Sequence, residues 1–171
     1  TQWLTAGAGI QHAEMFPLVS TEAPNPLHLF QIWVNLPAAD KMVDPHFAML
    51  WSEDIPEHTF TDDAGRTARV TTVAGALEGV EPPSPPPSSW GSRPESDLAI
   101  WTIRLEPGAT WTIPAAASAE TGRVLYLFEG TRVRVGPRKF PGKTVVQVAG
   151  EQSVSLEAGA DGAQILMLQG R

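Results

Sequence analysis

The sequence predicts an all-β protein. Apolar and polar residues alternate along most segments, and glycine, proline and other turn-forming residues separate these segments at short intervals. Sustained helical periodicity is nearly absent. Short strands at this spacing are typical of a β-sandwich or a closed barrel.

The pattern is most regular from Leu98 onward. Turn sequences such as Glu106-Pro107-Gly108 and Glu129-Gly130 separate its segments. In the segment after Glu129-Gly130, valines are expected to face inward and arginines outward. The predicted strands are Leu98–Leu105, Thr110–Ile113, Arg123–Phe128, Thr131–Val135, Lys143–Val148, Ser153–Leu156 and Gln164–Leu168.

The first hundred residues are less uniform. Strands are expected at Thr1–Leu4 and His28–Leu36, and a hairpin is expected from Thr59–Thr61 and Arg66–Val73 around an Asp-Asp-Ala-Gly loop. The proline run Glu81–Ser89 favours an extended surface loop, with a PxxP ligand for a partner domain as the less favoured interpretation.

One short helix is expected after residue 43. Asp44 can cap it and Pro45 suits its first turn. Phe47, Leu50 and Trp51 would then share one face, and Ile55-Pro56 would mark the end.

Composition limits the classes of function. The 171 residues are 42% hydrophobic, enough for a core, and carry 12 basic and 19 acidic residues for a net charge of −7. This charge disfavours direct nucleic-acid binding, which needs clustered positive charge. No apolar run is long enough to cross a membrane. The absence of cysteine fits a reducing interior, so we expect a cytoplasmic protein, or a nuclear one if the source is eukaryotic.

Both ends of the chain have strand-like sequence. Thr1–Leu4 begins with neither an initiator Met nor a polar lead-in, and the chain stops three residues after Leu168. We therefore expect a fragment of a longer protein.

His12 and Glu14 are the residues that carry chemistry. Side chains two residues apart in an extended strand project from the same face. An imidazole and a carboxylate together can bind a divalent metal, and this mixture suits non-haem iron. A metal site needs at least three protein ligands, so this pair is an incomplete set.

Two segments resemble the pirin family of bicupin proteins. The first is Gln2–Met15, and the second is Leu29–Pro37, followed by Lys41–Pro45 and Ile55-Pro56. Further on, the resemblance is mainly a layout of strands and turns. It implies two tandem cupin barrels of the double-stranded β-helix type. Residues 1–37 would be the end of the N-terminal barrel, and residues 38–171 would be a linking helix and most of the C-terminal barrel.

The resemblance also implies the metal site. The family's N-terminal barrel holds one iron through three His and one Glu, so His12 and Glu14 would be the last two ligands. The other two would come from an upstream His-x-His motif, and the family also has a C-terminal segment beyond the position of Arg171. Fe(II) is the expected metal, with other divalent ions as alternatives, and this chain by itself is expected to bind metal weakly.

The remaining histidines and the aromatic and basic residues have simpler interpretations. His46 and His58 are expected on the surface, whereas His28 precedes a strand and has a small chance of approaching the site. No histidine follows His58, so the second barrel is expected to be structural or partner-binding. The six tryptophans more often fill cores than stack on a substrate, although Trp3 or Trp33 could line the first cavity. The cluster of Arg132, Arg134, Arg138, Lys139 and Lys143 is interpreted as a solvated face rather than an anion site.

The resemblance leads to two hypotheses about function. The first is an iron-dependent dioxygenase acting on quercetin or a similar flavonol, with His12 as a ligand and Glu14 as both ligand and catalytic base. The second is a non-enzymatic, iron-containing regulatory partner of transcription factors or metabolic enzymes, whose surface responds to the oxidation state of the metal. The fold alone does not decide between them.

Overall fold

The computed structural model describes all of residues 1–171 and contains twelve strands and three short 3₁₀ helices, but no α-helix. In chain order these elements are β1 (Gln2–Thr5), η1 (Ala38–Asp40), β2 (His46–Met49), β3 (Glu57–Thr61), β4 (Thr67–Ala74), η2 (Trp90–Ser92), η3 (Pro94–Ser96), β5 (Ala99–Leu105), β6 (Thr110–Ile113), β7 (Gly122–Glu129), β8 (Arg132–Val135), β9 (Arg138–Pro141), β10 (Thr144–Ala149), β11 (Val154–Ala158) and β12 (Ala163–Gly170). The all-β prediction is confirmed. No helix has the length and apolar character needed to cross a bilayer.

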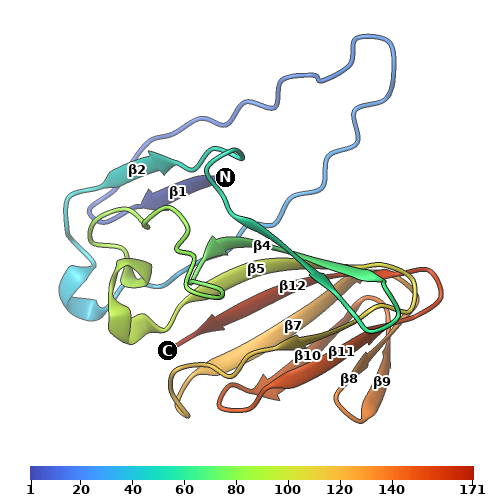
Figure 1. Ribbon diagram of the computed structural model, residues 1–171. Coiled ribbons are helices and arrows are strands. Elements are labelled where there is room, and N and C mark those ends of the chain that lie inside the picture. Colours follow the sequence, from blue (N-terminus) through green and yellow to red (C-terminus); the bar gives the residue numbers. More distant parts are fainter.

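Two antiparallel sheets face each other in the larger part of the molecule (Figure 1). One has six strands in the order β10-β7-β12-β5-β4-β3, and the other has four in the order β6-β11-β8-β9. Strands distant in sequence pair throughout, as when β12 lies between β5 and β7. This arrangement is that of the predicted β-barrel.

A core of 20 buried residues fills the space between the two sheets. It is built by alternation: Leu125 and Leu127 on β7 and Ile165 and Met167 on β12 are fully buried. On β8 the valines are buried and the arginines are not, as predicted. Burying one such aliphatic side chain contributes roughly 1.5–3 kcal/mol, so these rows are a main source of stability.

The predicted helix after residue 43 is wrong. His46–Met49 is instead strand β2, which pairs with β1 from Gln2↔Met49 to Thr5↔His46. Leu50 exchanges two backbone hydrogen bonds with Thr1, each 2.8 Å long. Because β1 offers an open edge of backbone donors and acceptors, pairing along that edge overrides the local helix signals.

A smaller core lies on the other face of the six-stranded sheet. Trp3 from β1 and Leu50 pack there with Ala74, Ile100 and Leu166. This core fixes the β1–β2 pair against the barrel, so the start of the chain is anchored.

Residues 6–37 form an arm that leaves β1, loops away from the barrel and returns to it (Figure 1). The strand predicted at His28–Leu36 is wrong, because no backbone group of this segment forms a hydrogen bond with another strand. The alternation is nevertheless expressed in packing. Phe30, Ile32 and Val34 lie against the smaller core while Leu29 and Trp33 are exposed.

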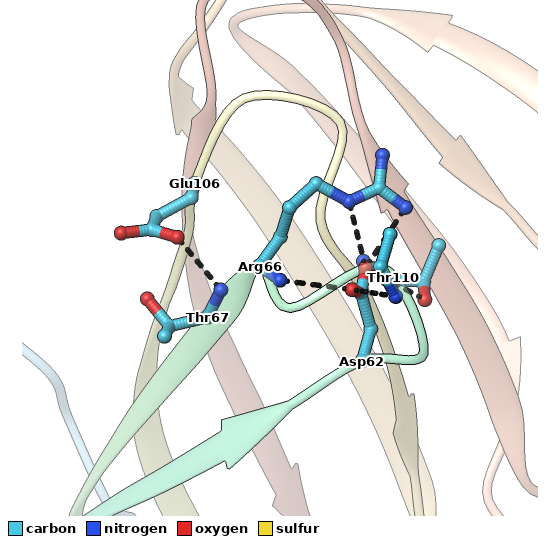
Figure 2. A network of polar contacts seen from close by, with 6 residues as sticks. Asp62, Arg66, Thr67, Glu106 and Thr110 are labelled. Atoms are coloured by element: carbon cyan, nitrogen blue, oxygen red, sulfur yellow. Dashed lines mark hydrogen bonds and ion pairs between the residues drawn. The ribbon is translucent and has the colours of Figure 1, made fainter.

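The β3–β4 hairpin is confirmed, and a single carboxylate fastens its loop to the barrel (Figure 2). Asp62 accepts hydrogen bonds from the backbone N–H groups of Ala64, Arg66 and Thr110 at 2.9, 3.0 and 3.1 Å. The Arg66 guanidinium also donates to it at 2.9 Å. These bonds hold the pKa of Asp62 well below its ordinary value of 3.8, at about 2, with the Arg66 backbone N–H as the largest cause.

A second carboxylate makes a similar link. Glu106, in the turn between β5 and β6, accepts a hydrogen bond from the Thr67 backbone N–H at 2.7 Å, and this bond lowers the pKa of Glu106 (Figure 2). Asp62 thus connects the hairpin to the start of β6, and Glu106 connects the β5–β6 turn to the start of β4.

Strand β9 and the proline run agree less closely with the predictions made from the sequence. Strand β9 was not predicted, because it is charged and ends in Pro141, a residue that suits only the edge position β9 occupies. The proline run forms no regular element, as predicted. It packs inward at Pro86 and accepts a hydrogen bond from Thr5 Oγ1 through the Pro87 carbonyl.

Candidate metal ligands on the N-terminal arm

A tight turn directs the arm away from β1. Ala8 N–H donates to the Val43 carbonyl at 3.0 Å, and Gly9 N–H donates to the Ala6 carbonyl at 2.8 Å. Gly7 has a φ of +49°, and a Cβ there would lie 2.0 Å from the Val43 carbonyl oxygen. Only glycine fits at this position, so the sequence fixes the point at which the arm departs.

His12 and Glu14 follow this turn and lie side by side. His12 Nε2 is 3.8 Å from Glu14 Oε1, and the two side chains are 39% and 47% exposed. The spacing of two residues in extended chain places both on one side, as the sequence predicted. The pair therefore presents one nitrogen and one oxygen donor to solvent.

The structure brings no third ligand to this pair. Nowhere in the 171 residues do three His, Cys, Asp or Glu side chains gather as a metal site would require. The donor chemistry of His12 and Glu14 fits iron or another divalent transition metal, but the number of donors is too small for a stable site.

The other histidines lie elsewhere. His28, on the returning part of the arm, packs against Phe30 and Phe128 at ring distances of 5.1 and 5.0 Å, with Nδ1 3.7 Å from Glu129. His46 is exposed on β2.

His58 is not the surface residue that the sequence predicts. It belongs to β3, is half-buried and stacks on Phe60, and its Nε2 is buried without a hydrogen-bond partner. The error arose because β3 begins at Glu57, two residues before the predicted start.

The tryptophans divide between the cores and the surface. Trp3 and Trp101 are buried, which agrees with the expectation that such residues fill cores. Trp33 is 87% exposed. It lines an apolar hollow of about 630 Å³ between residues 32–37 and the ends of β5 and β12.

A second, polar hollow of about 280 Å³ lies beside Asp62 and Thr110. Neither hollow is lined by His12 or Glu14, so both are separate from the candidate ligands.

The basic cluster is an open strand face. Arg134 pairs with Glu157 at 3.1 Å, and the Arg138 guanidinium lies 5.4 Å from the centre of the Phe140 ring. These contacts agree with a solvated face rather than a built anion site.

A buried polar group that the sequence did not reveal lies at the end of the barrel. Arg123, on β7, is 1% exposed and donates through Nε and Nη2 to Gln169 Oε1 at 3.0 and 2.5 Å. Burial lowers the pKa of this arginine, and the nearby charge of Asp97 opposes the shift. Gln169 in turn donates to Asp97, so an amide links the two charges.

Comparison with known proteins identifies the relatives of this chain. No protein-family model matches it. A pirin-like protein of Caulobacter vibrioides is 30% identical over 170 residues, which cover 99% of the chain and 55% of that protein. Human pirin is 50% identical over 56 residues, covering 33% of the chain and 18% of pirin. The chain is therefore similar in sequence to pirin and to a pirin-like protein.

A candidate quercetin 2,3-dioxygenase of Pseudomonas aeruginosa is 29% identical over 173 aligned residues, covering 99% of this chain and 55% of that protein. The chain thus spans about half the length of the curated relatives that match it from end to end.

The fold agrees with this relationship. The crystal structure of a quercetin 2,3-dioxygenase from Acinetobacter baumannii superposes with a TM-score of 0.64 over 81% of this chain and 44% of its own, at 23% identity. Together with the two facing antiparallel sheets, this confirms the predicted cupin-type barrel.

Proposed function

We propose that the intact protein is an iron-dependent oxidoreductase of the quercetin (flavonol) 2,3-dioxygenase type, with His12 and Glu14 as two of its metal ligands. The observation that carries this proposal is the 3.8 Å approach of His12 Nε2 to Glu14 Oε1 on an exposed arm. Pirin-like relatives named as candidate quercetin 2,3-dioxygenases support the choice of chemistry.

The proposal assigns residues 1–37 to the end of a first cupin barrel and residues 38–171 to a second. It is supported by Phe30, Ile32 and Val34, which have strand-like alternation and pack on the barrel without a backbone partner. Such a segment is suited to pairing with strands that this chain does not contain. The remaining metal ligands would come from the same additional polypeptide.

Each candidate residue has a defined role. Bound Fe(II) would supply redox chemistry and a positive charge that favours the ionised form of a flavonol hydroxyl. His12 would serve as a ligand only. Glu14 has two carboxylate oxygens, so it can bind the metal and also accept the hydroxyl proton as the substrate arrives.

The test is oxygen consumption with quercetin by the longer polypeptide that contains this chain. Glu14→Gln keeps the size of the side chain but removes the base and weakens the ligand, so we expect turnover to fall by at least about 100-fold. Glu22→Gln is the matched control, because Glu22 is an exposed carboxylate on the same arm. Turnover that survives Glu14→Gln, or survives removal of the metal, would contradict the proposal.

A regulatory role is the second candidate, and the distribution of exposed apolar residues favours it. Of the large apolar side chains that are exposed, all but Val80 and Val145 lie between Met15 and Trp51. Large exposed apolar side chains in such number along one part of the chain are typical of a surface that binds another protein. In this alternative the protein binds a transcription factor or a metabolic enzyme, and affinity depends on the oxidation state of the iron. Equal partner affinity in the ferrous and ferric forms would eliminate it.

A further inference from the structure

Residues 38–43, which we call the junction segment, meet both ends of the N-terminal arm. The arm returns to the barrel at Pro37, whose carbonyl accepts a hydrogen bond from the Asp40 backbone N–H at 2.9 Å. The arm leaves at the turn where Ala8 N–H donates to the Val43 carbonyl at 3.0 Å. Val43 N–H in turn donates to the Asp40 carbonyl at 3.3 Å, so Asp40 is linked by backbone bonds to both ends of the arm.

Two features attach the junction segment to the rest of the protein. On one side, strand β2 begins at His46 and pairs with β1. On the other side, the Asp40 carboxylate forms an ion pair with the Arg93 guanidinium, and η1 lies beside the turns that precede β5 (Figure 1). The Asp40 side chain is only 16% exposed, so this pair is screened by water and salt less than a fully exposed one.

Arg93 is itself anchored to the end of strand β12. Its guanidinium carbon lies 5.8 Å from the centre of the Trp90 ring, and Trp90 Nε1 donates to the Arg171 carbonyl at 2.6 Å. The Arg171 backbone N–H, directly after β12, donates to the Ser96 carbonyl at 2.8 Å. The guanidinium that holds Asp40 therefore rests on the six-stranded sheet.

The Arg93–Asp40 pair differs from the other arginine–carboxylate pairs in what it joins. The others connect parts of the barrel to each other. Only the Arg93–Asp40 pair connects the barrel to the segment between the arm and β2. Because His12 and Glu14 follow closely after Ala8, a displaced junction segment would change the position from which both of them project.

We propose that Arg93 is a positioning residue for the metal ligands His12 and Glu14, acting through Asp40 and the junction segment. The inference rests on the proposed function, and it gives the second barrel, in which no cluster of metal ligands is present, a part in that function. Ligands must be held within about 0.5 Å of their working geometry. A junction segment released from Arg93 would hold them less closely and so weaken metal binding.

The first measurement uses the chain Thr1–Arg171 and needs no metal. Arg93→Met removes the charge but keeps an unbranched side chain, and near-ultraviolet circular dichroism reports an intact barrel. Amide hydrogen exchange followed by NMR reports the Ala8 N–H that is bonded to Val43. We expect this amide to exchange at least about 5-fold faster in Arg93→Met, with β7 and β12 unchanged. Arg93→Lys keeps the charge and should restore most of the protection.

The second measurement uses the longer polypeptide with Co²⁺ as the probe, because the visible absorption of bound Co²⁺ depends on ligand geometry. Arg93→Met should change this spectrum and lower the affinity for Co²⁺ by at least about 5-fold. Asp40→Asn should have the same effects, and adding Arg93→Met to it should change little further, because both variants break one contact. Arg134→Met is the matched control, since Arg134 is equally exposed but pairs with Glu157 on the four-stranded sheet.

The inference is overturned if Arg93→Met leaves either the Ala8 exchange rate or the Co²⁺ spectrum unchanged, even where the melting temperature falls. It is also overturned if Arg134→Met has an equal effect, or if the effects of Arg93→Met and Asp40→Asn simply add. The proposed function fails by a different result, namely quercetin turnover that survives Glu14→Gln. Exchange at Ala8 in the metal-free chain still measures the link through Asp40 in that case, so the two failures are distinguishable.

Discussion

At the scale of single residues, the Asp62 carboxylate ties the β3–β4 loop to a neighbouring strand. Its carboxylate is 6% exposed and accepts bonds from the backbone of both the β3–β4 loop and β6. Replacing Asp62 by Asn converts an ionised acceptor into a neutral amide that cannot satisfy all these donors. We expect Asp62→Asn to lower the melting temperature at pH 7 by about 2–8 °C. Asp63→Asn, next to it and exposed, should have little effect.

The effect of Asp62 should depend on pH in one direction. Folding lowers the pKa of this group from 3.8 to about 2. A carboxyl group of this kind stabilises the fold fully above its unfolded pKa, and the contribution disappears as pH falls through the folded pKa. The difference in melting temperature between wild type and Asp62→Asn should therefore be constant above about pH 5 and shrink as pH falls from 3.8 toward 2. A difference that grew on acidification would contradict this account.

Residue-scale chemistry was only partly predictable. The approach of His12 to Glu14 follows from their spacing, because local extended geometry decides it. The burial of His58 Nε2 and of Arg123 does not follow from local sequence, because both depend on which face of a strand meets the opposite sheet. An arginine is rarely buried without a partner, and the partner of Arg123, Gln169, lies 46 residues later in the chain.

At the scale of elements, β10 offers a direct test of the inward and outward faces. Val146 is 7% exposed and Val145 is 63% exposed, although they are neighbours in one strand. Val146→Ala leaves a cavity in the main core and should cost about 1–3 kcal/mol of unfolding free energy. Val145→Ala removes the same atoms from the surface and should change it by less than about 0.5 kcal/mol. Urea denaturation of both variants measures the contrast, and equal costs would show that the register is wrong.

The element predictions succeeded where apolar and polar residues alternate regularly, as in β5 to β8 and β10 to β12. The strand expected at Thr1–Leu4 is confirmed as β1, but the predictions failed for His28–Leu36 and for the helix after residue 43. Strand β2 depends on an edge supplied by β1, more than forty residues earlier, and short-range helix signals at Asp44 and Pro45 gave no hint of it. For His28–Leu36 a strand was predicted where none forms. The alternation of buried and exposed side chains is real, but no neighbouring strand pairs with this segment.

At the scale of the whole molecule, the barrel and the arm differ in how fully they bury their apolar residues. The barrel buries its apolar residues between two sheets, whereas the arm and β2 expose Met15, Val19, Trp33 and Trp51 among others. Two relatives whose alignments cover 99% of this chain are almost twice as long as it, because the chain spans 55% of each. The proposed ligands His12 and Glu14 and most of the exposed apolar residues lie in the same part of the chain, before residue 52.

This difference predicts a pattern of amide hydrogen exchange. No backbone N–H from Leu29 to Leu36 donates to another backbone group, so these amides should exchange within seconds in the isolated chain. Amides of β7 and β12, at the centre of the six-stranded sheet, should be protected for far longer. If residues 1–37 complete a first barrel, the same Leu29–Leu36 amides should become protected in the longer polypeptide, while β7 and β12 stay unchanged as internal controls. Fast exchange of Leu29–Leu36 in both polypeptides would show that this segment is not a strand of a first barrel.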